Sequence, residues 1–188
     1  NKTEIKKILD LGAKGIIVPM INTALEAKNA ISYATYPPKG QRGYALARAQ
    51  GFGYNLNNYL KVSKNIKIVV QIETIKAINN LGEILKVKGI HSTLIGPRDL
   101  SGSIGKAGDY KNKKFIKALQ KYEKLSRQNN VSMGMHVAFP QTETLNKFIK
   151  KGYKFVAMGT DMTFLGDTIR EKLEKIKKWK FTDLFQQE

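Results

Sequence analysis

The sequence predicts an α/β fold in which helices cover a parallel sheet. Short β-branched runs alternate with longer segments whose apolar residues recur at helical spacing. Parallel strands need long crossover connections, so this strict alternation favours a parallel sheet over hairpins. With 188 residues, of which 41% are hydrophobic, the chain is long and apolar enough to form a core. We therefore expect a single domain over residues 1–188.

The first three elements are expected to be a helix, a strand and a helix. Residues 2–11 have helical periodicity, and Gly12 supplies a C-terminal stop. The run GIIVPM at 15–20 is bounded by Gly and Pro, which is typical of a short strand buried on both faces. Residues 23–34 again place apolar residues on one side, which predicts the next helix.

Residues 36–54 break the periodicity with two prolines and four glycines. Long irregular segments in compact domains are usually functional or disordered. A short helix is expected at 57–64, after which the alternation resumes. The expected strands are 66–73, 92–96, 132–137 and 155–159, and the expected helices are 75–85, 113–128 and 142–151. A last amphipathic helix is expected to contain Leu165, Ile169, Leu173, Ile176 and Trp179.

Five strands are fewer than a closed barrel requires. A complete (β/α)8 TIM barrel takes about 250 residues and eight strands, so we predict the later part of such a barrel, lacking its first three strands. An open doubly wound sheet is the alternative. Because a five-stranded piece exposes two unpaired edges, we expect the sequence to belong to a longer polypeptide.

The composition excludes several classes of protein. The absence of cysteine excludes a disulfide scaffold, a thiolate zinc site and a cysteine nucleophile. The formal charge is +18, but no cluster combines arginines with aromatic residues, so we do not expect a nucleic-acid partner. No apolar stretch approaches the roughly 18 residues that a membrane span needs, and no leader opens the chain. We expect a cytoplasmic protein without a membrane partner.

Two carboxylates follow neighbouring strands of the predicted sheet. Glu73 ends the strand at 66–73, and Asp99 comes just after the strand at 92–96. The carboxyl ends of parallel strands meet at one edge, so both side chains are expected at the same mouth. Taken alone, Glu73 is explained as a carboxylate that stabilises the dipole at the start of the next helix, and Asp99 is explained as an N-cap. Together, beside Gln71, they favour a site for a divalent cation such as Mg²⁺ or Mn²⁺.

Three runs are similar to one known family. They are YPPKGQRG at 36–43, VQIET at 70–74 and GPRDLSGSIG at 96–105, with support from LDLGAKGIIVPM at 9–20. The chain resembles the HpcH/HpaI aldolases, metal-dependent pyruvate aldolases that are related to citrate lyase β-subunits. The resemblance implies a barrel of the phosphoenolpyruvate/pyruvate type. It also implies a carbon–carbon lyase that cleaves or forms 4-hydroxy-2-oxo acids through a pyruvate enolate.

The resemblance also implies roles for individual residues. Glu73 and Asp99 are similar to the carboxylate ligands of the family's divalent metal, which is Mg²⁺, Mn²⁺ or Co²⁺. Gln71 resembles the side chain that contacts the bound 2-oxo acid, whose carboxylate is expected to accept from the backbone N–H groups of Arg98 and Asp99. Asp10 is similar to the aspartate that partners a catalytic histidine.

Three further side chains remain open to two interpretations. His136 ends a strand at the mouth, where it either lines the site or only packs. Arg98 either reaches the incoming aldehyde or lines the rim. The glycine-rich segment 40–53 is expected near the mouth, with Arg42 as a candidate to hold acidic substrate or a neighbouring subunit. The alternative for Arg42 is a structural clamp within a long loop.

The runs that carry the family's catalytic histidine and its substrate-binding arginine have no counterpart in this sequence. We therefore expect the chain alone to lack full aldolase turnover. The expected small-molecule partners are pyruvate and an aldehyde, and the last helix is expected to pack on a neighbouring subunit in a homo-oligomer. One alternative is a degenerate or truncated barrel that acts as a binding protein. Another is a lyase for acyl-CoA thioesters.

Overall fold

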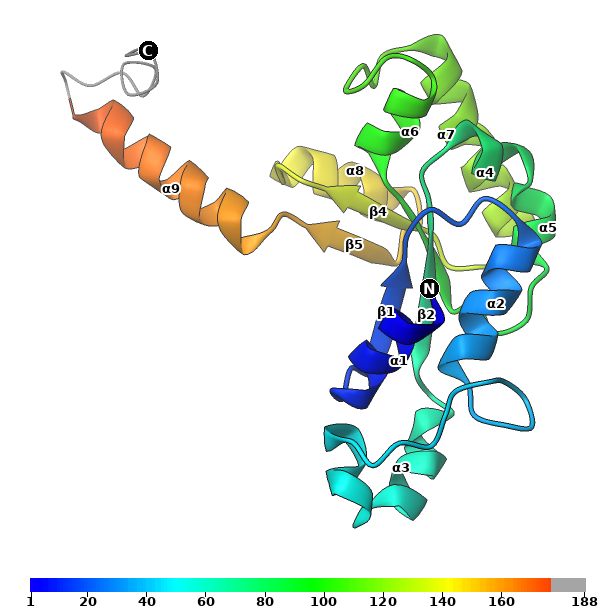
Figure 1. The fold of residues 1–188 in the computed structure, drawn as a ribbon. Coiled ribbons are helices and arrows are strands. Elements are labelled where there is room, and N and C mark those ends of the chain that lie inside the picture. Colours follow the sequence, from blue (N-terminus) through cyan, green and yellow to red (C-terminus); the bar gives the residue numbers. More distant parts are fainter. Residues whose placement is uncertain (177–188) are drawn as a thin grey trace.

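The computed structural model describes residues 1–176, whose strands form one curled parallel sheet (Figure 1). Within these residues the sheet has five strands in the order in which they occur along the chain. They are β1 (Gly15–Val18), β2 (Lys67–Ile72), β3 (Ser92–Ile95), β4 (Gly134–Val137) and β5 (Phe155–Met158). The α/β fold and all five predicted strand positions are confirmed.

One face of the sheet is covered by the helices that connect consecutive strands, and further helices precede β1 and follow β5 (Figure 1). They are α1 (Lys2–Asp10), α2 (Ala24–Ala34), α3 (Leu56–Ser63), α4 (Ile75–Asn79), α5 (Leu81–Leu85), α6 (Pro97–Ser103), α7 (Lys113–Gln128), α8 (Thr142–Lys150) and α9 (Asp161–Lys175). The helix predicted at 75–85 is two helices, because Asn80 leaves the helical conformation between them. Part of the irregular segment forms a kinked 3-10 helix, η1 (Arg48–Gly53).

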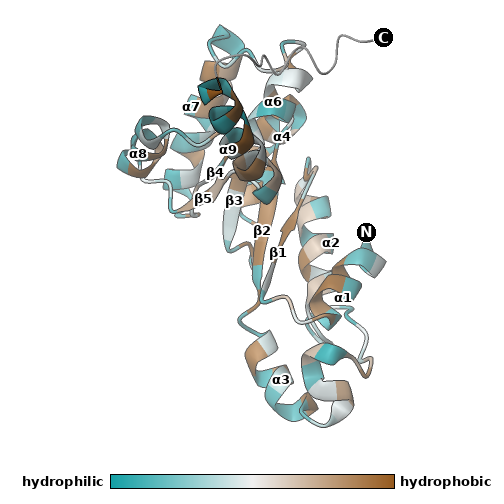
Figure 2. Ribbon diagram, turned by 90° about the vertical axis from the view of Figure 1, so that its left-hand side faces the viewer, coloured by the Kyte–Doolittle hydropathy of each residue, from teal (hydrophilic) through white to brown (hydrophobic). Residues whose placement is uncertain are grey.

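The core lies between the sheet and the helices. Alternate residues of each strand point to this side, as Ile68, Val70 and Ile72 do on β2. They pack with buried residues of the helices, including Ala27, Ile78, Leu81, Ile84, Phe115 and Tyr122. Figure 2 shows the strands as largely hydrophobic. The intervening residues face the other side, where Gln71 of β2 pairs in register with Leu94 of β3.

Helix α9 leaves the sheet and extends away from the other helices (Figure 1). Its apolar residues are exposed, with Met162 at 76% and Leu165 at 62%. The predicted helix is confirmed up to Lys175, whereas Trp179 lies outside the described residues. Of the helices within residues 1–176, none has both the length and the hydropathy to cross a membrane.

Candidate active site

A buried carboxylate lies at the carboxyl end of β2. Glu73 is only 4% exposed, and both of its oxygens accept hydrogen bonds. Oε1 accepts from the backbone N–H of Met20 at 2.7 Å, and Oε2 accepts from Nε2 of Gln71 at 2.5 Å. None of the ion pairs among residues 1–176 includes Glu73. A buried charge is costly unless it is paired or coordinates a cation, so this carboxylate is available to a positive ligand.

Glu73 lies against Gly96, which directly follows the neighbouring strand β3. Ile72 pairs with Ile95, which pairs in turn with Met135. Continued by one residue, this register aligns Glu73, Gly96 and His136 across three strands. A Cβ atom on Gly96 would lie 2.7 Å from Oε2 of Glu73 and 2.9 Å from Nε2 of Gln71. Because Gly96 has no side chain, the side chains of Glu73 and Gln71 can occupy this space.

Helix α6 begins directly after this glycine, which is its N-cap residue. Pro97 opens the helix, where its fixed φ is favourable and no N–H is needed. Arg98 and Asp99 lie in the first turn with exposed side chains, and Asp99 forms no ion pair within residues 1–176. The structure therefore brings Gln71, Glu73, Arg98, Asp99 and His136 to one edge of the sheet, as predicted for the mouth.

The donor set at this edge suits a hard cation that keeps open positions. Among the described residues, no three His, Cys, Asp or Glu side chains gather into a metal site. Within residues 1–176, the two carboxylates proposed as ligands at this edge are Glu73 and Asp99. Mg²⁺ is commonly bound through one or two carboxylates, with waters and substrate oxygens as its other ligands. The chemistry of these residues fits such an ion.

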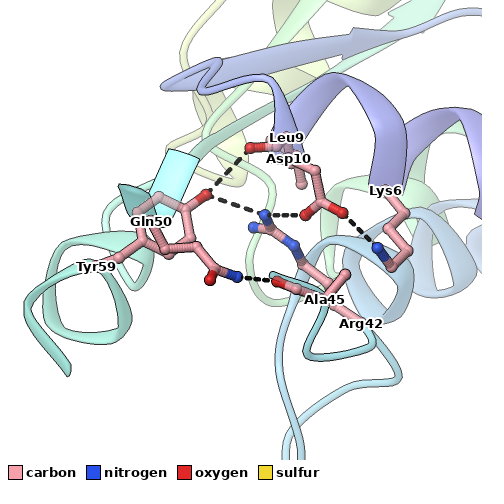
Figure 3. A network of polar contacts seen from close by, with 7 residues as sticks. All are labelled: Lys6, Leu9, Asp10, Arg42, Ala45, Gln50 and Tyr59. Atoms are coloured by element: carbon pink, nitrogen blue, oxygen red, sulfur yellow. Dashed lines mark hydrogen bonds and ion pairs between the residues drawn. The ribbon is translucent and has the colours of Figure 1, made fainter. Parts of the chain in front are cut away.

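A second polar cluster surrounds Arg42 (Figure 3). Its side chain is fully buried, and Nη2 donates to Oδ1 of Asp10 at 2.8 Å and to the hydroxyl of Tyr59 at 3.0 Å. The guanidinium also lies 4.6 Å from the centre of the Tyr36 ring, which is a cation–π distance. Lys6 forms an ion pair with the other oxygen of Asp10. Burial lowers the pKa of Arg42, but the bonds to Asp10 and Tyr59 outweigh it, so its pKa is raised.

The Arg42 cluster lies at the opposite end of the sheet from Glu73, because Asp10 precedes β1 whereas Glu73 follows β2 in a parallel sheet. The prediction that segment 40–53 lies near the mouth is therefore wrong within this chain. The segment includes η1 and is followed by α3, so these elements together connect the end of α2 to the start of β2. Connections that lead from a crossover helix to the next strand lie at the amino edge of a parallel sheet. Asp10 precedes β1 and lies at that edge for the same reason. The geometry matches a structural clamp, and catalytic roles for Asp10 and Arg42 stay predictions.

Two residues of the site were missed by the sequence reasoning. Met20 was placed at the end of a strand, but nothing in the sequence indicated that its N–H bonds to Glu73, 53 positions away. The sequence places Gly96 at the end of the expected strand 92–96 and at the start of the run GPRDLSGSIG, without indicating its contact with Glu73. A signal existed for Gly96, because glycine at a strand end often marks close approach of another group.

The position of the buried carboxylate defines a class of protein. This chain is an α/β protein, and in parallel α/β folds ligands bind at the carboxyl ends of the strands, which is where Glu73 lies. The family model for HpcH/HpaI aldolase/citrate lyase matches residues 1–167. The chain belongs to the HpcH/HpaI aldolase/citrate lyase family. The resemblance inferred from the sequence runs is confirmed.

Known relatives agree with this assignment. The chain is 32% identical over 182 residues to a 2-keto-3-deoxy-L-rhamnonate aldolase of Escherichia coli strain K12, which covers 96% of this chain and 67% of that protein. An HpcH/HpaI aldolase/citrate lyase family protein from Burkholderia cenocepacia J2315 has a similar structure, with a TM-score of 0.87, 25% identity and coverage of 95% and 70%. An HpcH/HpaI aldolase from Desulfitobacterium hafniense DCB-2 has a TM-score of 0.85, with 24% identity and coverage of 96% and 70%.

Proposed function

We propose that the carboxyl edge of this sheet binds a divalent cation and a pyruvate-like 2-oxo acid for aldol cleavage or synthesis of 4-hydroxy-2-oxo acids. One observation carries the proposal. Glu73 is buried without a cationic partner within residues 1–176, in a protein that has 33 lysines and arginines. The name of the Escherichia coli relative, an aldolase for a 2-keto-3-deoxy sugar acid, supports a 2-oxo acid substrate.

Each residue has a specific task in this proposal. Glu73 and Asp99 would hold the cation, which when bound polarises the ketone of the 2-oxo acid and favours enolate formation. Gln71 uses one amide proton on Glu73 and keeps a second proton and a carbonyl oxygen for substrate. The backbone N–H groups of Arg98 and Asp99 and the half-buried His136 are proposed as further substrate contacts.

The remaining finer features are also proposals. The curled sheet is taken as the later part of a (β/α)8 barrel, which agrees with the alignment to 67–70% of the length of these relatives. Pyruvate and an aldehyde are the proposed partners, and the cytoplasm is the proposed location. Arg98, exposed at the start of α6, is proposed to face the aldehyde.

Titration with Mn²⁺, first without and then with pyruvate, tests the metal site. The electron paramagnetic resonance signal of the free ion measures how much Mn²⁺ is bound. We expect saturable binding that pyruvate tightens, because a 2-oxo acid supplies two more oxygen ligands. Glu73→Gln keeps the size of the side chain but removes its charge, and we expect the affinity to fall at least about tenfold.

The control is Glu83→Gln, the same chemical change at an exposed residue of α5 that pairs only with Lys86 among the described residues. This variant is expected to bind Mn²⁺ as the unchanged protein does. Equal affinities for Glu73→Gln and Glu83→Gln would refute the metal assignment and favour a non-catalytic binding protein.

We further propose a homo-oligomer in which α9 packs on a neighbouring copy. Its apolar residues Leu165 and Ile169 are exposed at 62% and 45%, and burial of such side chains is worth roughly 2 kcal/mol each. The double variant Leu165→Asp, Ile169→Asp is expected to elute as a smaller species in gel filtration with light scattering. Lys172→Asp, which changes the net charge equally, should leave the mass unchanged. A stable monomer of the unchanged protein would contradict the proposal.

A further inference from the structure

Met20 has a backbone conformation that residues other than glycine rarely adopt. Its φ is +56°, in the left-handed region that favours glycine. Such a conformation costs of order 1–3 kcal/mol and persists only where the surroundings impose it. It occurs two residues after β1 ends, at the same edge of the sheet as Glu73.

Hydrogen bonds of Asn22 also fix the turn between β1 and α2 that contains Met20. The Asn22 side chain donates to the carbonyl oxygen of Met20 at 2.8 Å. Asn22 in turn donates its N–H to the carboxylate of Glu26 at 2.6 Å, within the N-terminal cap of α2. The turn between β1 and α2 is thus fixed at both of its ends, which accounts for the persistence of the strained residue.

The left-handed conformation of Met20 determines where its backbone N–H points. It aims the N–H of Met20 at Oε1 of Glu73, with a donor–acceptor distance of 2.7 Å. A hydrogen bond to an ionised carboxylate is about twice as strong as one between neutral groups. The Met20 side chain is 55% exposed, so packing of that side chain does not explain the strain.

We infer that Met20 is a positioning residue for Glu73, acting through its left-handed backbone and not through its side chain. The inference rests on the proposed function, since it assigns to this turn the orientation of a proposed metal ligand. With Oε1 fixed by Met20 and Oε2 by Gln71, the carboxylate is oriented before any cation arrives. Groups that orient a metal ligand typically change metal affinity 10–100-fold when they are removed.

Two substitutions of Met20 separate the backbone from the side chain. Met20→Asn and Met20→Val both remove the methionine, but asparagine tolerates the left-handed conformation and a β-branched valine does not. We expect Met20→Asn to bind Mn²⁺ within about twofold of the unchanged protein, and Met20→Val to bind about tenfold or more weakly. Equal affinities for the two variants would overturn the inference.

A second measurement needs neither metal nor a folded valine variant. With ¹⁵N-methionine the five methionines give five amide signals, and Met20 is the one that Met20→Asn removes. We expect this amide to exchange slowly with solvent, and to shift and exchange at least about tenfold faster in Glu73→Gln, because the charged acceptor is lost. An unchanged Met20 amide in Glu73→Gln would overturn the inference.

The two measurements also keep the inference distinct from the proposed function. If Glu73→Gln leaves Mn²⁺ affinity unchanged, the proposed metal site fails, whatever the amide signal shows. If Glu73→Gln abolishes binding while Met20→Val binds normally, the metal site stands and Met20 does not position it.

Discussion

Replacing Arg42 by methionine is expected to lower the free energy of unfolding by about 3–5 kcal/mol. The guanidinium is fully buried, and its Nη2 joins Asp10 of α1 to Tyr59 of α3. Methionine fills much of the volume but leaves Asp10 and the Tyr59 hydroxyl without this donor. Since domains are stable by only about 5–15 kcal/mol, this loss is a large fraction of the total stability.

Urea denaturation followed by far-ultraviolet circular dichroism measures this effect. The control is Lys86→Met, which removes an exposed ion pair with Glu83 and is expected to cost less than about 1 kcal/mol. In the double variant Asp10→Asn, Arg42→Met the loss should be smaller than the sum of the single losses, because the two residues contact each other. A stability of Arg42→Met equal to that of Lys86→Met would show that the cluster is not a clamp.

Replacing Gly96 by alanine is expected to reduce Mn²⁺ affinity at least about tenfold while leaving the fold intact. The backbone of Gly96 is extended, with φ −92° and ψ 93°, so alanine fits the local conformation. The added Cβ would meet Oε2 of Glu73 at 2.7 Å and Nε2 of Gln71 at 2.9 Å. Both atoms are the far ends of flexible side chains, which can move away, while the Cβ of Glu73 at 3.1 Å has to shift by only a few tenths of an ångström. The carboxylate is then no longer oriented by its two donors.

The control is Gly82→Ala on α5, where an added Cβ meets no atom within 4 Å. This change is expected to raise stability by roughly 0.5–1 kcal/mol, because glycine is unfavourable inside a helix. The two alanine variants are compared by Mn²⁺ titration and by thermal unfolding. Normal Mn²⁺ affinity in Gly96→Ala would mean that the orientation of Glu73 does not matter for the site.

The strands could be predicted because their signals are local. The β-branched run at 66–73 became β2 (Lys67–Ile72), and the strand-end rule correctly located Gln71 and Glu73 at the carboxyl edge. Helix boundaries were harder where apolar spacing continued across a break. The single helix expected at 75–85 divides at Asn80, which has a non-helical conformation, and both halves contribute buried residues to the core.

The position of Arg42 was predicted wrongly for a reason that the sequence itself contains. A glycine-rich motif suggested a functional loop at the mouth, but the segment follows a helix, α2, and leads through α3 to β2, instead of following a strand. Connections of that kind lie at the amino edge of the sheet. The order of the elements along the chain therefore places Arg42 at the amino edge, where Asp10 also lies.

By itself the sequence determined the order of helices and strands, the family, and the edge of the sheet where polar side chains gather. The order of elements and the edge follow from periodicity and strand direction, and the family follows from the resemblance of the runs at 36–43, 70–74 and 96–105. All of these are properties of short segments. Only the tertiary structure decided how Glu73 is held, with one bond from a residue 53 positions away and space left by Gly96 on the next strand. Such contacts depend on how closely the curled sheet brings the ends of different strands together. No local pattern of residues encodes the distance between those strand ends.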